Sequence, residues 1–452
     1  MSSNRFLSGI TEDCAMWVFA LLLVALAVYQ KALWFVPAGD DVRILSSVSQ
    51  TSNPLSYLWS DWGQQGTYRL ANGTIDTRRR SYRPMHSISI WLAYRTVGVS
   101  AFPNQLINLA LHVLNCFLFY RIVRRVCPVH FATFLLVVLS LVSLYTASPA
   151  IWVSDRPTLV VGLSVLILLS HAIDSRGQCV TRLNPWIVTG VTLLAVSFQE
   201  SGMVLPLIAG VFVMLPGYEG RRWQHLAWFV GLACAYLGLR IALFGSNAFV
   251  YASEGFVFGT RPYALLSDLP WQLGLWARIE NVAKNALCVF VPIIDPMGRV
   301  DSLRVLLRSA VWWLPTLVLA IAATRRPITK VQWLALAIIG LNAALHVQVF
   351  RYRVEYISQF AFCLYVADSR LWKAADSSEE KWSVPMRLVG VCGAILALVC
   401  TSQVNHYVQE NWVLRQNEVV NHHLATTTQN YAVSPVVVKE ILERYAPGAS
   451  EN

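Results

Sequence analysis

Long apolar stretches recur from Cys14 to Cys400 and restrict the chain to one class of fold. The first stretch, residues 14–36, is long enough to cross a hydrocarbon core of about 30 Å. Only 13% of the 452 residues are charged, whereas soluble proteins have about 25%. Mean hydropathy is +0.49. Because backbone polar groups must be satisfied internally within lipid, these runs predict an all-α polytopic membrane protein.

The apolar runs of helical length predict about eleven transmembrane helices. Their ranges are 14–36, 104–122, 130–147, 153–172, 184–200, 202–215, 223–244, 306–323, 331–349, 354–370 and 386–403. Residues 1–403 are thus predicted to form one transmembrane domain, and residues 404–452 a short tail. The apolar segment 282–294 is too short to span and is predicted to be re-entrant or interfacial.

Basic residues in alternate short connections predict the orientation. They are Arg121, Arg124 and Arg125; Arg176 and Arg182; Arg221 and Arg222; Arg325, Arg326 and Lys330; and Arg370 and Lys373. All of them face the cytoplasm if the N-terminus is cytoplasmic. The long loops 37–103 and 245–305 and the tail then face outward. The net charge of +11 is explained by these topology signals and by contact with lipid phosphate, so nucleic acid is not expected as a partner.

Two short helices are predicted outside the apolar runs. Residues Pro84–Val97 have apolar positions interleaved with Arg83, His86 and Arg95, as in an amphipathic helix lying at the membrane surface. Pro435–Tyr445 is predicted to form a helix with Ser434 as its cap. The nine cysteines are scattered without metal-ligand spacing, so neither disulfides nor a redox role is predicted.

Asp40 and Asp41 follow the first apolar run directly. Two adjacent carboxylates where a membrane helix meets water disfavour each other's ionisation, which suits a general base or a ligand for a divalent cation. A solvated helix end is the alternative. No cofactor is required by the sequence, and a divalent cation held by Asp40 and Asp41 stays open.

Several strings, in order, resemble one enzyme family, the transmembrane O-mannosyltransferases that carry TPR repeats. The strings are Leu55-Ser56-Tyr57-Leu58-Trp59-Ser60-Asp61-Trp62-Gly63, Ser81-Tyr82-Arg83-Pro84-Met85, Asn108-Leu109-Ala110-Leu111-His112, Ser154-Asp155-Arg156-Pro157, Ser197-Phe198-Gln199-Glu200 and Arg351-Tyr352-Arg353-Val354-Glu355-Tyr356. The chain differs from the family in lacking TPR repeats, in having Gln199 where a lysine is expected, and in keeping only part of the Arg351 motif.

The resemblance implies a GT-C glycosyltransferase that takes a monosaccharide from a polyprenyl-phosphate carrier on the non-cytoplasmic face. Without TPR repeats, bacterial relatives that modify glycans, lipids or surface proteins are closer, so a bacterial inner membrane is favoured over an ER membrane. The resemblance assigns the general base to the acidic pair, with Asp40 as base and Asp41 orienting the acceptor or Asp40.

The departing phosphate calls for arginine side chains. The candidates for binding it are Arg83, Arg156, Arg351 and Arg353. The candidates for supporting the site are Asp61, Tyr82, His86, Asp155, Glu200 and Tyr352. For Asp155 the alternative is a surface neighbour of Arg156, and Glu200 is expected at an outward turn, pairing with an arginine. His112 and His346 are interpreted as hydrogen-bonded core histidines.

Two other functions remain open. A multi-span glycan polymerase or ligase also uses undecaprenyl-linked substrates, but depends on outward arginines and a histidine. A lipid or glycolipid transporter is the second, although the sequence has no inverted halves and no matched pair of broken helices.

Overall fold

The computed structural model describes most of the apolar part of the chain. The ranges are 12–37, 40–49, 53–54, 68–69, 75–76, 83–244, 254–255, 264–265, 276, 278–279, 282–283, 285–287, 310–324, 327–346, 355–369, 384–420 and 435–445. Within them the chain is all-helical apart from two minimal antiparallel pairs. These are β1 (Tyr68–Arg69) with β2 (Ile75–Asp76), and β3 (Glu254–Gly255) with β4 (Ala264–Leu265). The predicted fold class is confirmed at this level.

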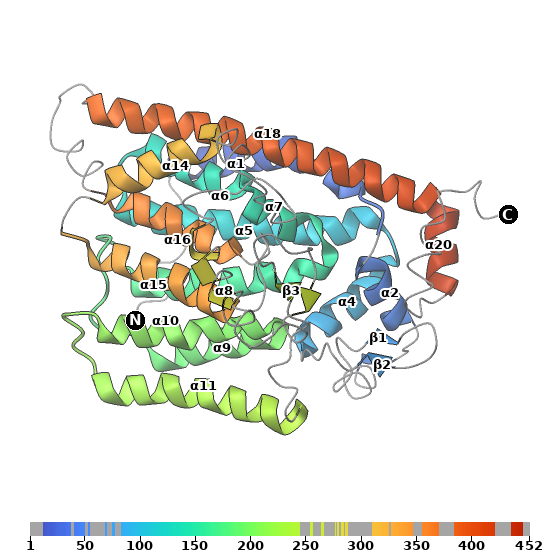
Figure 1. Cartoon of the computed structure of the whole chain (residues 1–452), viewed down its shortest axis with the longest axis horizontal. Coiled ribbons are helices and arrows are strands. Elements are labelled where there is room, and N and C mark those ends of the chain that lie inside the picture. The colour runs from blue at the N-terminus through green and yellow to red at the C-terminus, as the bar shows by residue number, and fades with distance from the viewer. Residues whose placement is uncertain are drawn as a thin grey trace.

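The long helices lie side by side in a bundle, with α18 along one side and α11 along the opposite side (Figure 1). They are α1 (Glu12–Tyr29), α5 (Ala101–Val126), α6 (His130–Val142), α7 (Leu144–Ile151), α8 (Arg156–Ala172), α9 (Pro185–Phe198), α10 (Val204–Met214), α11 (Arg222–Phe244), α14 (Ala310–Ala323), α15 (Lys330–Leu345), α16 (Tyr356–Ala367) and α18 (Val384–Val420). Short 3-10 turns connect some of them: η2 (Ala32–Trp34), η3 (Val153–Asp155) and η4 (Glu200–Met203).

Several helices have the length and composition of membrane spans. Four qualify among the described residues, namely Ala101–Val126, Val153–Ala172, Arg222–Ala242 and Gly390–Val413. The bent pair His130–Val142 and Tyr145–Ile151 makes a fifth if it counts as one span, and six further apolar helices have 10–17 residues. A helix is present in each of the eleven predicted ranges. The chain therefore has the helices of a membrane protein.

Two helix ends differ from the prediction. The first helix ends at Tyr29 and is followed by η2, whereas the apolar run predicted one helix to residue 36. The helix α18 runs on to Val420, so the predicted boundary at residue 403 falls inside it. Its sequence turns polar there, but Val404, Tyr407 and Val408 remain buried. Their spacing keeps one apolar face on the bundle, which explains why the helix continues.

A buried polar network joins three helices near the centre of the bundle. The Tyr356 hydroxyl accepts from Asn115 Nδ2 at 2.8 Å and lies 3.0 Å from His112 Nδ1. The other ring nitrogen of His112 lies 3.0 Å from the Leu141 carbonyl oxygen. His346 Nδ1 likewise lies 2.9 Å from the Asn342 carbonyl oxygen. His112 is therefore a hydrogen-bonded core histidine, as predicted, whereas His346 is hydrogen-bonded but only half-buried at the end of α15.

Several of the basic connections gather at one end of the bundle. Arg125, in the last turn of α5, donates to the carbonyls of Ser170 and Ile173 at 2.7 Å each. The turn before α9 meets the turn before α11 through the Glu219 amide, which donates to the Thr181 carbonyl at 2.9 Å. These connections, far apart in sequence, therefore share one end.

Three short helices pack together at the other end, α2 (Asp40–Ser49), α4 (Pro84–Val97) and α20 (Pro435–Tyr445) (Figure 1). The bounds of α4 and α20 are those predicted. Their shared apolar core consists of Val36, Val42, Leu45, Val48, Ile90, Val99, Val153, Val437 and Ile441. The Tyr445 hydroxyl also accepts from the Ala101 amide at 2.6 Å. The C-terminal helix thus holds α2 and α4 against the bundle.

We expect Ile441→Ala to loosen this three-helix cluster. Ile441 is fully buried, and removing a buried isoleucine side chain typically costs about 2–5 kcal/mol. The thermal unfolding midpoint of the purified protein in detergent should fall. Val436→Ala, on the same helix but 67% exposed, is the matched control and should leave the midpoint unchanged. Equal midpoints for the two variants would contradict the packing of α20 on α2.

Candidate functional site

The carboxylate of Asp41 is built into the junction between α2 and the bundle. Asp41 is only 1% exposed, and its Oδ1 accepts a hydrogen bond from the Ser154 amide at 2.9 Å. Ser154 belongs to η3, which leads directly into α8. Asp40 is the first residue of α2, and its side chain lies outside the described atoms. The structure therefore fixes Asp41 as a buried residue and places Asp40 next to it in the chain.

Arg156 begins α8 and is 2% exposed. Its Nε donates to Asn108 Oδ1 at 2.8 Å, and its Nη2 donates to the Asn104 carbonyl at 3.4 Å. Its Nη1 lies 3.5 Å from the Ser89 carbonyl oxygen, on α4. The negative charge of Asp41 acts on this guanidinium. A buried cation needs such a countercharge, so Asp41 and Arg156 form one electrostatic unit.

Glu200 meets two arginines at the turn between α9 and α10, accepting a hydrogen bond from Arg83 and forming an ion pair with Arg240. Its Oε2 lies 3.0 Å from both Nε and Nη2 of Arg83, which immediately precedes α4. Its Oε1 lies 3.4 Å from Nη1 of Arg240, on α11. Burial raises the pKa of Glu200, but the two guanidinium groups lower the pKa by more, so it stays below its ordinary value. Glu200 is therefore an ionised carboxylate between two cations, and the expected pairing with an arginine is confirmed.

His86 lies between these two charged groups, in the first turn of α4. Its side chain is 6% exposed, and the charges that act on it are those of Arg83 and Arg156. Burial first, and then the two arginines, lower the pKa of His86 well below its ordinary value. Its Nδ1 has no hydrogen-bond partner among the residues that the structure describes. His86 is therefore a buried, neutral imidazole on which the charges of both Arg83 and Arg156 act.

Protonation of His86 should make the folded state less stable in mild acid. Its pKa is lower in the folded than in the unfolded chain, so the unfolded chain takes up the proton first as the pH falls through about 6.5. Stability should then fall by up to about 1.4 kcal/mol per pH unit between pH 6.5 and 5. Unfolding midpoints of wild type and His86→Phe across this range test it. A variant with the same slope as wild type would contradict it.

The structure brings together five predicted site residues and says nothing of several others. Asp41, Arg83, His86, Arg156 and Glu200 meet at the end of the bundle that holds α2, α4 and α20. Asp155 is buried in η3, so the alternative of a surface neighbour is wrong. The candidates that lie outside the described residues are Asp61, Tyr82, Arg351, Tyr352 and Arg353.

Two contributors were missed at the level of sequence. Arg240 interrupts an otherwise apolar stretch of α11, and a charge at such a position usually has a partner or a function. The sequence carries that signal within the apolar run 223–244, but it does not show which acidic residue Arg240 meets. Asn108 is the first residue of the string Asn108–His112. Its role as hydrogen-bond acceptor for Arg156 depends on the packing of α5 on α8, which the sequence does not show.

Asp41 acts as a hydrogen-bond acceptor at this junction. Its Oδ1 accepts from the Ser154 amide, and its charge acts on the Arg156 guanidinium. Across the described part of the chain, no three His, Cys, Asp or Glu side chains come together as a metal-binding group.

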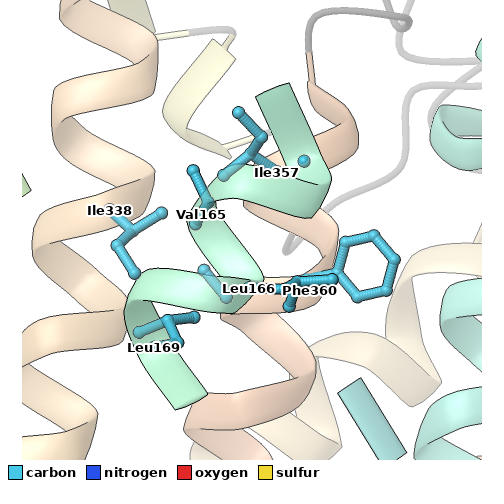
Figure 2. A pocket seen from close by; sticks show the side chains of 8 residues that line it. Val165, Leu166, Leu169, Ile338, Ile357 and Phe360 are labelled. Atoms are coloured by element: carbon cyan, nitrogen blue, oxygen red, sulfur yellow. The ribbon is translucent and has the colours of Figure 1, made fainter. Parts of the chain in front are cut away.

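An apolar gap lies between α8, α15 and α16, and none of these charged residues lines it (Figure 2). It is lined by Gly162, Val165, Leu166, Leu169, Ile338, Ile357, Phe360 and Ala361. The gap has no room for a water molecule and no polar side chain on its wall. It is a packing gap in the bundle and offers no chemistry.

The charged end of the bundle is thus the candidate site. It combines the buried carboxylates of Asp41 and Glu200, three arginines and a neutral histidine from five segments, namely α2, the start of α4, α8, η4 and α11. Comparison of the chain with protein-family models, curated proteins and solved structures gives no match.

Proposed function

We propose that the chain is a GT-C type glycosyltransferase that moves a monosaccharide from a polyprenyl-phosphate carrier to a hydroxyl group. The acceptor is a glycan, a lipid or a protein. The observation that carries the proposal is the meeting of Asp41, Arg83, His86, Arg156 and Glu200 at one end of an apolar helix bundle. Arg83, Arg156 and Glu200 come from strings that resemble the motifs of such enzymes, and an anionic leaving group needs guanidinium groups of this kind.

In the proposed reaction Asp40 removes the proton from the acceptor hydroxyl. The acceptor oxygen forms a bond to the anomeric carbon as the bond from that carbon to the phosphate oxygen breaks. The electron pair leaves with the polyprenyl phosphate, and the anomeric configuration inverts. Asp41 fixes the start of α2 through the Ser154 amide and so orients its neighbour Asp40.

The proposal includes a topology. About eleven helices cross the membrane, the N-terminus is cytoplasmic, and the site faces the periplasm of a bacterial inner membrane. Two observations support it. The basic turns around Arg125 and Thr181 share one end of the bundle, and the candidate site lies at the helix ends remote from Arg125, such as the start of α5 and α8. Positively charged loops favour the cytoplasmic side, so the end with the basic turns is cytoplasmic and the opposite end, with the candidate site, faces outward.

A glycan polymerase or ligase is the second candidate. The buried His86 beside Arg83 and Arg156 favours it, since such enzymes depend on arginines and a histidine. The two functions differ in their need for Asp40, which a polymerase or ligase of that type does not use.

Transfer by the purified protein tests the proposal. The full chain in liposomes receives a polyprenyl-phosphate-linked radiolabelled sugar and candidate acceptors, and the product is followed by mass. In cells, deletion of the gene should remove one sugar from one envelope glycan, lipid or surface protein. Unchanged envelope glycans, lipids and surface proteins after deletion would contradict the proposal.

A further inference from the structure

We propose that Asn108, on α5, is a positioning residue for the proposed transfer reaction. It holds the guanidinium of Arg156 and the turn η3 in one arrangement. The inference deepens the proposed function and rests on it, since it takes Arg156 as a residue that binds the phosphate of the polyprenyl-phosphate donor. Asn108 acts on the donor only through Arg156.

The side-chain amide of Asn108 is engaged at both ends. Asn108 is fully buried, its Oδ1 accepts from Arg156 Nε at 2.8 Å, and its Nδ2 donates to the Trp152 carbonyl at 2.7 Å. A guanidinium can only donate and a carbonyl oxygen can only accept, so these two partners fix which end of the amide is which. One planar group therefore ties the arginine to the turn that precedes it.

Asn108 also sets the orientation of the Arg156 guanidinium. Its contact with Nε is 2.8 Å, whereas Nη1 and Nη2 lie 3.5 and 3.4 Å from the carbonyl oxygens of Ser89 and Asn104. N–H···O hydrogen bonds are normally about 2.7–3.2 Å long, so the two outer contacts are weak. The strong contact thus orients the guanidinium, and the two outer nitrogens form the planar fork that can turn to phosphate oxygens.

The same side chain fixes the start of η3. The Trp152 carbonyl, which accepts from Asn108, also accepts from the Asp155 amide at 3.1 Å and so closes the turn. Within this turn the Ser154 amide donates to Asp41 at 2.9 Å. A displaced Asn108 would therefore move two parts of the candidate site together, the arginine and the acidic pair.

The plainer interpretation is that Asn108 only satisfies a backbone carbonyl where the chain breaks between α7 and η3. Within an apolar bundle such a carbonyl needs a donor. Gln105, three residues earlier on α5, does this for Ile151: its Nε2 donates to that carbonyl at 3.0 Å, and its Oε1 has no partner among the described residues. Gln105 is buried like Asn108, but its hydrogen bond serves the backbone alone. It is therefore the matched control for a purely structural role.

Binding of polyprenyl phosphate to the purified full chain in detergent is the test. Asn108→Leu removes both hydrogen bonds with little change in volume. We expect it to raise the Kd about tenfold, because the fork of Arg156 is no longer held in one orientation. Gln105→Leu removes the donor to the neighbouring carbonyl, so it should lower the unfolding midpoint but bind polyprenyl phosphate as wild type does. Equal Kd values for wild type and Asn108→Leu would overturn the proposal.

Two further variants check that Asn108 acts through Arg156. In the Arg156→Lys background, which lacks the fork, Asn108→Leu should add little to the Kd. A full tenfold rise in that background would show that Asn108 acts without Arg156 and would overturn the positioning role. If Asn108→Leu does not fold, Asn108→Ala carries the test, and a wild-type Kd for Asn108→Ala would overturn the proposal.

Kinetics of transfer separate the failure of this role from the failure of the proposed function. With Asn108→Leu the donor KM should rise and kcat should fall, whereas the acceptor KM should keep its wild-type value. A rise in the acceptor KM alone would overturn the positioning role and leave the proposed function. A wild-type chain that does not bind polyprenyl phosphate would overturn both. A chain that binds it through Arg156 and Asn108 but transfers no sugar would refute the proposed function alone.

Discussion

Replacing Arg156 by methionine should destabilise the protein more than any other single substitution at the site. The guanidinium is 2% exposed and is held by the Asn108 side chain and two carbonyls, while the Asp41 charge acts on it. Methionine fills similar space but leaves the buried Asp41 carboxylate without this countercharge. Each buried acceptor that loses its donor typically costs about 1–3 kcal/mol, and Arg156 serves the Asn108 side chain and two carbonyls. The unfolding midpoint in detergent should fall accordingly, and transfer should be lost.

A double-mutant cycle gives this prediction its control. Asp41→Asn in the Arg156→Met background removes the negative charge of Asp41. The asparagine side-chain oxygen can still accept the hydrogen bond from the Ser154 amide. The double variant should therefore be more stable than Arg156→Met alone. Strictly additive losses would show that Asp41 and Arg156 are not coupled, contrary to the structure. Activity separates the roles further: if some transfer survives, Arg156→Met should raise the donor concentration required and leave the choice of acceptor unchanged.

Much of the helical framework could be predicted because hydropathy and capping are local properties. The runs between residues 104 and 244 predict α5 to α11, and the two short helices begin at Pro84 and Pro435, where proline suits the first helical position. The apolar run to residue 36 does not mark the end of the first helix, which lies at Tyr29. The run continues because apolar residues of the separate turn η2 are buried against the bundle. The end of α18 was missed for the opposite reason, because its last turns are mostly polar.

The candidate site could be predicted only residue by residue. Arg83, Arg156 and Glu200 were readable as charges next to apolar helices, but their partners depend on tertiary packing. Glu200 meets Arg83 across the contact between α4 and the turn after α9, and meets Arg240 across α11. No spacing along the chain encodes those contacts. The hydrogen bond from the Ser154 amide to Asp41 likewise depends on how α2 lies against η3.

Asp40→Asn should abolish transfer and leave the fold intact. Asp40 is the first residue of α2, and asparagine serves the start of a helix as well as aspartate does. Loss of a general base typically lowers kcat by about 10²–10⁴-fold. Initial rates of sugar transfer by the purified variant, beside its unfolding midpoint, measure both effects. The midpoint should match that of wild type.

Asp41→Asn is the matched comparison, because the two neighbouring carboxylates should fail in different ways. Asp41 is buried and coupled to Arg156, so its loss should lower the midpoint and the rate together. Asp40→Asn should lower the rate alone. Near-normal transfer by Asp40→Asn would remove Asp40 as the base and favour the polymerase or ligase function, in which His86 and the arginines do the chemistry. The His86→Phe variant would then lose the activity that Asp40→Asn keeps, because the imidazole would be the group that the reaction needs.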